Sequence, residues 1–579
     1  MAKLLYACSR RPFGIELTDR LRSICRALRP DNVRADWSPV VRCDDRIAHA
    51  CTVATAALQE RGSSVLLGAL YESGPVSWET PGGALPDGSY ALIRASEDRI
   101  EAATDPAGSR TVWYFVDDEV FAASTSQRAL IMFLGSFEFN PSAIPWMLST
   151  GSLGPELSWD RRIKRLQPAS SIILDRSRWL LLDGEHTPIV FTPREASRTS
   201  HAEAITAALE QTVATMQHLD WSQWVLPLSG GYDSRSLLCL IKEHIGIPPA
   251  FRTITWGLAA SLNQRSNDAY VARAVALAVG VPHEYFNTDL SHEPAQDILD
   301  RFIACAEGRT DHLAGYADGM DIWRRLTESG IGGIIRGDEG FGWVHVTSEL
   351  GTKLSVEGAL CSDFENLKDI PQMLGLPPHE LPDFLLRGPD ESLEAWRDRL
   401  YHAYRIPTVL AALSDAKLSY VEQITPLLAR RILHAARALP DALRTEKTLY
   451  TRVVSRLGPG IPYEGHGANA DPRDILEKPK VTEVIRAGLS DSSVRHVLPD
   501  ELINRVLAGI APAAGGDTSA ARTKGIKRAI ARRLPRFAKD LLRATVVRPT
   551  VGGNTLAFRA YIITRMVRLL TDDSRGVGR

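Results

Sequence analysis

A short turn with two glycines, SGGYDS at residues 229–234, carries the strongest chemical signal in the sequence. It lies between an apolar run typical of a buried strand and a stretch with helical spacing of apolar residues. The glycines let backbone NH groups approach a ligand closely, and the start of a helix adds positive potential. Such a turn is suited to binding an oxyanion, and phosphate is the expected ligand. The simpler alternative is a tight turn that binds no ligand. The predicted contacts are Ser229, Gly230, Gly231, Asp233 and Ser234.

A second acidic loop, GDEGFG at residues 337–342, also follows an apolar strand pattern. Ligands of open parallel sheets bind at the carboxyl ends of the strands, so both loops are expected to face one crevice. Asp233 and Asp338 are therefore predicted to bind Mg²⁺ that is held by a triphosphate, and an exposed acidic turn is the simpler alternative for Asp338. Asp268 is either a carboxylate at a helix N-terminus or a contact to the nucleotide. No lysine follows the glycines of residues 229–234, which excludes the GxxxxGK[ST] nucleotide loop.

The elements that position these loops change in character along the chain. Short alternating apolar runs at residues 63–71, 88–96, 99–105, 111–118 and 119–125 predict strands of an antiparallel sheet. The composition turns polar at residues 191–200, where a domain boundary is expected. Beyond it, expected strands at 224–231, 250–257 and 330–337 alternate with expected helices at 234–246 and 267–281. Such strand–helix units predict a parallel sheet covered by helices.

The totals of the sequence exclude several classes of protein. The 579 residues are too many for one compact core. Lys plus Arg total 68 against 69 Asp plus Glu, which gives no reason to expect nucleic acid or an anionic membrane as a partner. The seven cysteines contain no CxxC pair, and no apolar run reaches the roughly 20 residues of a membrane span. A cytoplasmic enzyme without a disulfide framework or a thiolate zinc site is therefore expected.

Four segments together carry a family resemblance. SGGYDS, TITWG, NDAYVARAVALAVGVPH and GDEGFG resemble, in order and spacing, the synthetase domain of asparagine synthetases, β-lactam synthetases and lasso-peptide cyclases. Upstream, the stretch with Asp105, Gly108 and Arg110 is similar to the amidotransferase half of that family. Downstream, VEQITPLLARRILHAARALP resembles a degraded form of its VExRxPFLD segment.

The resemblance implies a fold and a set of cofactors. It implies an α+β N-terminal amidotransferase-like domain, an αββα sandwich, over residues 1–195. It further implies an α/β parallel-sheet synthetase domain of the ATP-pyrophosphatase type over residues 196–579. ATP and Mg²⁺ are the implied cofactors. Further nucleotide contacts are expected at Thr255, Gly257, Asp268 and Gly337.

The sequence departs from the family at its first residues. A glutamine-dependent member needs a cysteine directly after the initiator methionine, because the thiol is the nucleophile and the free α-amine is the base. This sequence has Ala2 there. Cys8 would carry no free α-amine, and it is expected to be a small buried residue of a first strand. No ammonia is therefore expected, and the amine acceptor is predicted to be a substrate in its own right.

The catalytic groups also depart from the family. Asparagine synthetases have an acidic residue shortly before the paired Asp-Glu, whereas this chain has Ile335 and Arg336 in that stretch. Arg336 is interpreted as a cation near phosphate or carboxylate, with a surface salt bridge as the alternative. The late loop at 458–467 lacks the family's lysine, which leaves Lys447, Lys478 and Lys480 as candidates. The predicted catalytic residues are Lys447, Arg336 and Glu339, the general base is not assigned, and His283 is interpreted as structural.

These features predict an AMP-forming, ATP-dependent amide ligase without glutaminase activity. The leading hypothesis for the reaction is macrolactam (isopeptide) closure of a lasso precursor peptide. A leader-binding protein and a protease are expected to deliver that peptide. The alternatives are small-molecule amide synthesis of the β-lactam-synthetase or asparagine-synthetase type, and a decayed nucleotide-binding scaffold.

Residues 522–568 hold thirteen Arg or Lys and one acid, Asp540. That stretch is either a solvated helix face or a grip for an acidic peptide or for phosphates.

Overall fold

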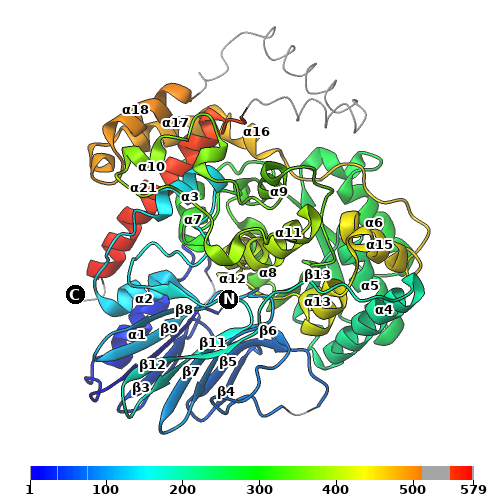
Figure 1. The fold of residues 1–579 in the computed structure, drawn as a ribbon, viewed down its shortest axis with the longest axis horizontal. Coiled ribbons are helices and arrows are strands. Elements are labelled where there is room, and N and C mark those ends of the chain that lie inside the picture. Colours follow the sequence, from blue (N-terminus) through cyan, green and yellow to red (C-terminus); the bar gives the residue numbers. More distant parts are fainter. Residues whose placement is uncertain (1, 35–36, 75, 511–547, 577–579) are drawn as a thin grey trace.

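Two six-stranded antiparallel sheets form the first part of the chain in the computed structural model, which describes residues 2–34, 37–74, 76–510 and 548–576 (Figure 1). Sheet A has the order β10 (Lys164–Arg165), β8 (Trp113–Val116), β9 (Val120–Ser124), β1 (Leu4–Ser9), β3 (Ile47–Cys51) and β2 (Val40–Cys43). Sheet B has the order β12 (Leu180–His186), β11 (Ser170–Asp175), β7 (Arg99–Thr104), β6 (Gly88–Ala95), β5 (Ser64–Leu70) and β4 (Leu58–Arg61). The antiparallel strands predicted from the alternating runs are confirmed as β5 to β9.

The alternation of side chains along β1 explains how the two sheets pack. Tyr6 and Cys8 belong to the core between sheets A and B. Leu5 and Ala7 point to the other face of sheet A, where they join a cluster with the helices α1 (Leu17–Ala27) and α2 (Gln127–Leu134). Successive residues of a strand face opposite sides, so β1 serves both layers. The prediction that Cys8 is a buried residue of a first strand is confirmed.

One layer of the expected αββα sandwich differs in the structure. The outer face of sheet B packs Leu66, Tyr90 and Leu92 against Trp78 and Leu85. The last two belong to the segment between β5 and β6, which has no helix in its described residues. The second helical layer is therefore replaced by a loop that buries two large apolar side chains.

A five-stranded sheet C follows, and all its neighbouring strands are parallel, as predicted. Its order is β15 (His283–Asn287), β14 (Arg252–Gly257), β13 (Trp224–Pro227), β16 (Gly333–Ile335) and β17 (Glu422–Ile424). The chain adds β14 and β15 on one side of β13 and then β16 and β17 on the other. The strand order thus reverses between β13 and β16, and such a switch point leaves a crevice at the carboxyl ends of the strands.

Helices cover sheet C and the remaining surface. The helices after β13 and β14 are α5 (Asp233–His244) and α6 (Asp268–Val279). The other α-helices are α3 (Ala143–Thr150), α4 (Arg198–Ala214), α7 (Ala295–Ala306), α8 (Asp321–Glu328), α9 (Glu349–Ser355), α10 (Ile370–Met373), α11 (Leu393–Leu400), α12 (Ala411–Leu418), α13 (Arg430–Arg437), α14 (Asp441–Arg444), α15 (Thr448–Val454), α16 (Pro472–Leu476), α17 (Pro479–Ser490), α18 (Asp500–Gly509) and α21 (Gly553–Gly576). Short 3₁₀ turns are η1 (Thr215–His218), η2 (Ala259–Asn263), η3 (Leu313–Tyr316), η4 (Cys361–Asp363), η5 (Asp383–Leu385), η7 (Pro426–Leu428), η8 (Thr445–Lys447) and η9 (Ser492–His496), and η6 (Tyr401–Leu410) is a π-helix. Within the described ranges, no helix combines the length and the apolar character needed to cross a bilayer.

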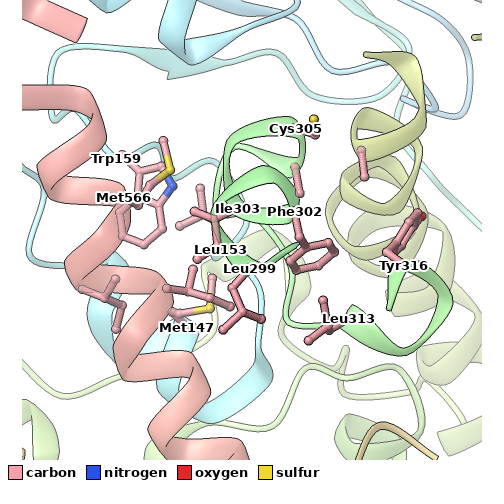
Figure 2. Close-up of a cluster of buried hydrophobic side chains, with 14 of the residues drawn as sticks. Met147, Leu153, Trp159, Leu299, Phe302, Ile303, Cys305, Leu313, Tyr316 and Met566 are labelled. Atoms are coloured by element: carbon pink, nitrogen blue, oxygen red, sulfur yellow. The ribbon is translucent and has the colours of Figure 1, made fainter. Parts of the chain in front are cut away.

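The C-terminal helix α21 joins the two parts of the chain. Figure 2 shows Met566 of α21 beside Trp159, and Met147 near Leu299 of α7, all within one hydrophobic cluster. Arg128 of α2 donates to Asp573 of α21 at 2.7 Å. The predicted boundary at residue 195 falls in the segment between β12 and α4, yet residues far beyond it pack on the first part.

The basic stretch at residues 522–568 lies partly outside the described residues, up to residue 547. In the part that the structure describes, Arg559 forms an ion pair of 2.6 Å with Asp311. Arg565 pairs with Asp300 at 2.7 Å. These two arginines fasten α21 to its neighbours, so neither is available to grip a peptide in this structure.

A buried ion pair connects sheet C with the segment that follows β7. Arg110 Nη2 lies 2.5 Å from Glu422 Oε2, and both side chains are about 2% exposed. Replacing Arg110 with methionine leaves the buried Glu422 carboxylate with the backbone NH of Ala2 but without the guanidinium charge, so the free energy of unfolding is expected to fall by about 3 to 5 kcal/mol. Urea unfolding of the variant measures this loss. The double variant with Glu422→Met should recover most of it, and a double variant as unstable as the single one would contradict the prediction.

His283, at the start of β15, is placed as a structural residue. Its Nδ1 lies 2.9 Å from Thr253 Oγ1. Burial, aided by the charge of Arg273, lowers the pKa of His283 to about 4. Between pH 6.5 and about 4 the unfolded chain binds a proton that the folded chain does not, so stability is expected to fall as the pH falls.

The size of this effect can be isolated with His283→Gln. The pKa difference corresponds to at most about 3 kcal/mol, less any relief from solvent. The difference in unfolding free energy between wild type and variant is expected to shrink from pH 7 to pH 4, because only the wild type carries this penalty. A difference that is constant over that range would show that His283 titrates normally.

Candidate active site

A pocket of about 380 Å³ lies at the carboxyl ends of β13, β14 and β16, at the switch point of sheet C. It is lined by Pro227, Leu228, Ser229, Asp233, Ser234, Thr255, Trp256, Asp268, Arg336, Gly337, Asp338 and Asn469. Eight of these residues were predicted from the sequence to bind nucleotide or metal or to act in catalysis. The structure therefore brings together predicted residues from as far apart in the chain as Ser229 and Asp338, and it adds Asn469 from a later segment.

The SGGYDS turn is ordered by its own hydroxyl groups. Ser229 donates its backbone NH to Ser234 Oγ at 2.8 Å, and the two hydroxyl oxygens lie 2.9 Å apart. Gly230 donates its NH to Asp268 Oδ1 at 2.5 Å. Asp268 thus contacts the turn directly. Its carboxylate accepts a hydrogen bond from a backbone NH group that the sequence predicts to bind phosphate.

The two acidic loops touch each other. A Cβ atom added to Gly337 would lie 2.9 Å from the backbone nitrogen of Ser234, so the absence of a side chain permits this approach. Asp233 and Asp338 line the same pocket. Burial raises the pKa of Asp233, and the negative charge of Asp338 adds to this rise.

The site suits a divalent cation at Asp233. Its Oδ1 atom is buried and has no hydrogen-bond partner in the described part of the chain. The hydroxyl of Tyr450 pairs with Ser236 Oγ at 2.8 Å and lies close enough to Asp233 to help lower its pKa against the larger effect of burial. A buried carboxylate oxygen without a donor is the type of ligand that Mg²⁺ takes, and Asp338 supplies a second carboxylate in the same pocket.

Lys447 bridges the two acidic loops. Its Nζ lies 2.9 Å from Asp233 Oδ2 and 2.8 Å from Glu339 Oε1. Glu446 and Lys447 both have left-handed backbones, with φ of 57° and 55°. Two such residues in succession cost energy, and backbone strain of this kind concentrates at functional sites. Here the strained turn directs the lysine to the carboxylates.

The charges of this bridge are set by burial and by mutual attraction. Burial raises the pKa of Glu339 to about 7, although the charge of Lys447 opposes the rise. For Lys447, burial favours the neutral amine, but attraction from Glu339 and Asp233 outweighs it and raises the pKa above its ordinary value. Lys447 is therefore a cation at neutral pH.

Arg336 lies in the pocket rather than only on the surface. Its Nη2 is 3.1 Å from Asp338 Oδ1 and its side chain is 28% exposed. Its Nε is buried and lacks a partner among the residues that the structure describes. Of the three candidate lysines, only Lys447 is brought to these residues, because Lys478 and Lys480 are exposed at the start of α17, outside the pocket lining.

A strap formed by residues 458–469 packs on the SGGYDS turn. Residues 458–467 correspond to the late lysine loop of the resembling family, and the sequence did not predict this packing. Arg235 of α5 donates to Ile461 O at 2.7 Å. Tyr463 of the strap stacks on Tyr232 with ring centroids 3.7 Å apart. Glu464 lies over the glycines: its Oε1 would be 3.1 Å from a Cβ on Gly231. These contacts were missed because a loop pattern does not reveal which surface the loop covers.

Two predicted nucleotide contacts have roles in packing. Thr255 lines the pocket, and its hydroxyl donates to the carbonyl oxygen of Leu228. Gly257 does not line the pocket. A Cβ atom added to Gly257 would lie 2.5 Å from the side chain of Ala468 in the strap. The absence of a side chain at Gly257 is therefore explained by close packing against the strap.

The residue after the initiator methionine is enclosed by protein. Ala2 is fully buried, and its backbone NH donates to Glu422 Oε1 at 3.0 Å. Burial raises the pKa of the Cys8 thiol, which makes the thiolate scarce at neutral pH. Neither residue offers a thiolate nucleophile.

Comparisons with known proteins assign no family to the chain. No family model matches it, and no curated protein does. Among solved structures, "Structure of the allosteric regulatory enzyme of purine biosynthesis" is 11% identical with a TM-score of 0.21, over 68% of this chain and 93% of that one. Glutamine phosphoribosylpyrophosphate amidotransferase from B. subtilis, complexed with ADP and GMP, is 9% identical with a TM-score of 0.21, over 68% and 94%. Likenesses of this size carry no conclusion about function.

Proposed function

We propose that the protein is an ATP-dependent amide ligase that adenylates a carboxylate, releases pyrophosphate and transfers the acyl group to an amine. The observation that carries the proposal is the convergence of Asp233 and Asp338 in one pocket at the switch point, with Lys447 bridging Asp233 to Glu339. A cation between carboxylates beside a glycine-containing turn at the start of a helix suits the handling of a metal-bound polyphosphate.

The residues of the site would have separate roles in binding metal, binding pyrophosphate and stabilising charge. Asp233 and Asp338 would hold Mg²⁺, which supplies neutralisation of phosphate charge when it is bound. The turn at residues 229–234 would hold the pyrophosphate portion of ATP. Lys447 would stabilise negative charge that develops as the amide forms. Glu339, with a pKa of about 7, would exchange a proton near neutral pH.

The amine would come from the substrate itself. Ala2 carries no thiol and the Cys8 thiol is buried, so neither side chain would serve as the nucleophile that releases ammonia from glutamine. We therefore infer ring closure within one molecule, and macrolactam (isopeptide) formation in a lasso precursor peptide is the leading reaction. Delivery of that peptide by a leader-binding protein and a protease belongs to the same proposal.

Mass spectrometry of a precursor peptide incubated with the enzyme, ATP and Mg²⁺ tests the proposal. The expected product has lost one water, with AMP and pyrophosphate formed in equal amounts. A peptide whose reacting Asp or Glu is replaced by Asn or Gln serves as the matched control and should stay linear. Adenylation of a small amino acid without any peptide turnover would favour the small-molecule ligases, and ATP binding without pyrophosphate release would favour a nucleotide-binding scaffold.

A further inference from the structure

Glu464 of the strap lies against the two glycines of the SGGYDS turn. Its two carboxylate oxygens would be 3.1 Å and 3.6 Å from a Cβ atom added to Gly231. Its own Cβ would be 2.9 Å from a Cβ atom added to Gly230, and its backbone NH donates to Gly230 O at 3.3 Å. Because the backbone and the side chain of Glu464 both touch the turn, rotation of the side chain alone does not uncover it.

The backbone NH groups of the turn already have acceptors from the protein. Gly230 donates its NH to Asp268 Oδ1 at 2.5 Å, and Gly231 donates its NH to Ser229 Oγ at 3.2 Å. Ser229 lines the pocket, whereas neither glycine does. A pyrophosphate that accepts from these NH groups must therefore replace acceptors of the protein and reach a surface that Glu464 covers.

The Glu464 carboxylate is incompletely satisfied in this position. Its Oε2 is buried and has no hydrogen-bond partner in the described part of the chain. Arg235 of α5, which contacts the strap, donates instead to the carbonyl oxygens of Gly230, Ile461 and Pro462. A buried acceptor without a donor is costly, so an anion with better hydrogen bonds can displace Glu464 from the turn.

Aromatic stacking and a backbone hydrogen bond hold the strap in place. Tyr463 stacks on Tyr232 of the turn, and the guanidinium of Arg235 lies 4.0 Å from the ring centroid of Tyr463. Gly465 donates its NH to Ser266 O at 2.9 Å. None of these five residues belongs to a strand of sheet C, so breaking their contacts leaves the hydrogen bonds of that sheet intact.

We propose that the strap is a lid that holds the SGGYDS turn closed, with the Glu464 carboxylate in the place of a phosphate group, and that it lifts when pyrophosphate or ATP binds. The proposal rests on the proposed function, in which the turn holds the pyrophosphate portion of ATP. Glu464 is then an internal competitor. The apparent affinity of the turn for a polyphosphate is reduced by the fraction of time that the lid is open.

A disulfide between positions 266 and 465 tests the lid without removing Glu464. A Cβ atom added to Gly465 would lie 3.9 Å from the Cβ of Ser266, which is within the range for a disulfide. Titration calorimetry with inorganic pyrophosphate and Mg²⁺ measures binding to the double variant Ser266→Cys/Gly465→Cys. The oxidised form is expected to bind about tenfold more weakly than the form reduced with dithiothreitol. Each single variant, treated in the same way, should show no such difference.

Removal of the competitor is expected to have the opposite effect. Glu464→Ala should bind Mg²⁺-pyrophosphate about tenfold more tightly, the factor for a lid that is open about one tenth of the time. Tryptophan fluorescence follows the binding rate, because Trp256 lines the pocket. With rising pyrophosphate this rate should reach a plateau in the wild type, where opening precedes binding, and rise linearly in Glu464→Ala. Glu477→Ala, which removes an exposed carboxylate beyond the strap, should match the wild type.

The outcomes separate the lid from the proposed function. Equal affinity for pyrophosphate in the oxidised and reduced double variant, or in Glu464→Ala and the wild type, would overturn the lid. Tight binding of α,β-methylene ATP in that case would leave the proposed function standing. Pyrophosphate binding that depends on reduction of the disulfide, without any binding of the ATP analogue, would support the lid and contradict the proposed function.

Discussion

Replacing Asp233 with asparagine is expected to lower ATP-dependent pyrophosphate release by about 10³-fold. The substitution keeps the size of the side chain and the oxygen that accepts from Lys447, but it removes the negative charge. Asp233 Oδ1 is the buried acceptor without a donor among the described residues, so the lost charge falls on the group best placed to bind metal. Pyrophosphate release with a precursor peptide, measured over a range of Mg²⁺ concentrations, gives the result.

The control for this variant is Asp220→Asn. Asp220 is an exposed carboxylate shortly before β13 that accepts hydrogen bonds from Ser222 and Gln223. Its replacement should leave pyrophosphate release unchanged. If Asp233→Asn kept full activity at low Mg²⁺, the assignment of this carboxylate as a metal ligand would be wrong.

Lys447→Met is expected to have the second largest effect. It should lower the rate of amide formation by about 10²- to 10³-fold, because the cation that pairs with the pocket carboxylate of Asp233 is lost. It should also lower the free energy of unfolding by about 3 kcal/mol, since Asp233 and Glu339 would face each other without a counter-charge. Single-turnover kinetics and urea unfolding measure the two effects separately.

The matched control for Lys447 is Lys368→Met. Lys368 forms an exposed ion pair with Glu365, and such pairs contribute little to stability. This variant should match the wild type in both measurements. A Lys447→Met enzyme that lost stability but formed amide at the wild-type rate would restrict Lys447 to a structural role.

Local patterns predicted much of the candidate site because their information is local. The SGGYDS turn lies between β13 and α5, and GDEGFG follows β16, as the apolar runs on either side indicated. Parallel pairing then follows from the alternation of strands and helices. The roles of these residues in binding ATP and Mg²⁺ stay predictions.

Several features depended on contacts between distant segments, which spacing along a chain does not encode. Three lysines were candidates, and only the tertiary structure selects Lys447, through a left-handed turn at residues 446–447. The packing of the strap on the glycine turn also depends on contacts between distant segments. So does the loop that replaces a helical layer over sheet B, where Trp78 and Leu85 fill the apolar surface.

By itself, the sequence determined that antiparallel strands precede a parallel sheet and that two acidic loops follow strands of that sheet. Only the tertiary structure decided that β13 and β16 are neighbours and that Lys447 joins the loops. The physical reason is that periodicity reports which face of an element is buried. Which segments meet at that face is set by the packing of the whole chain.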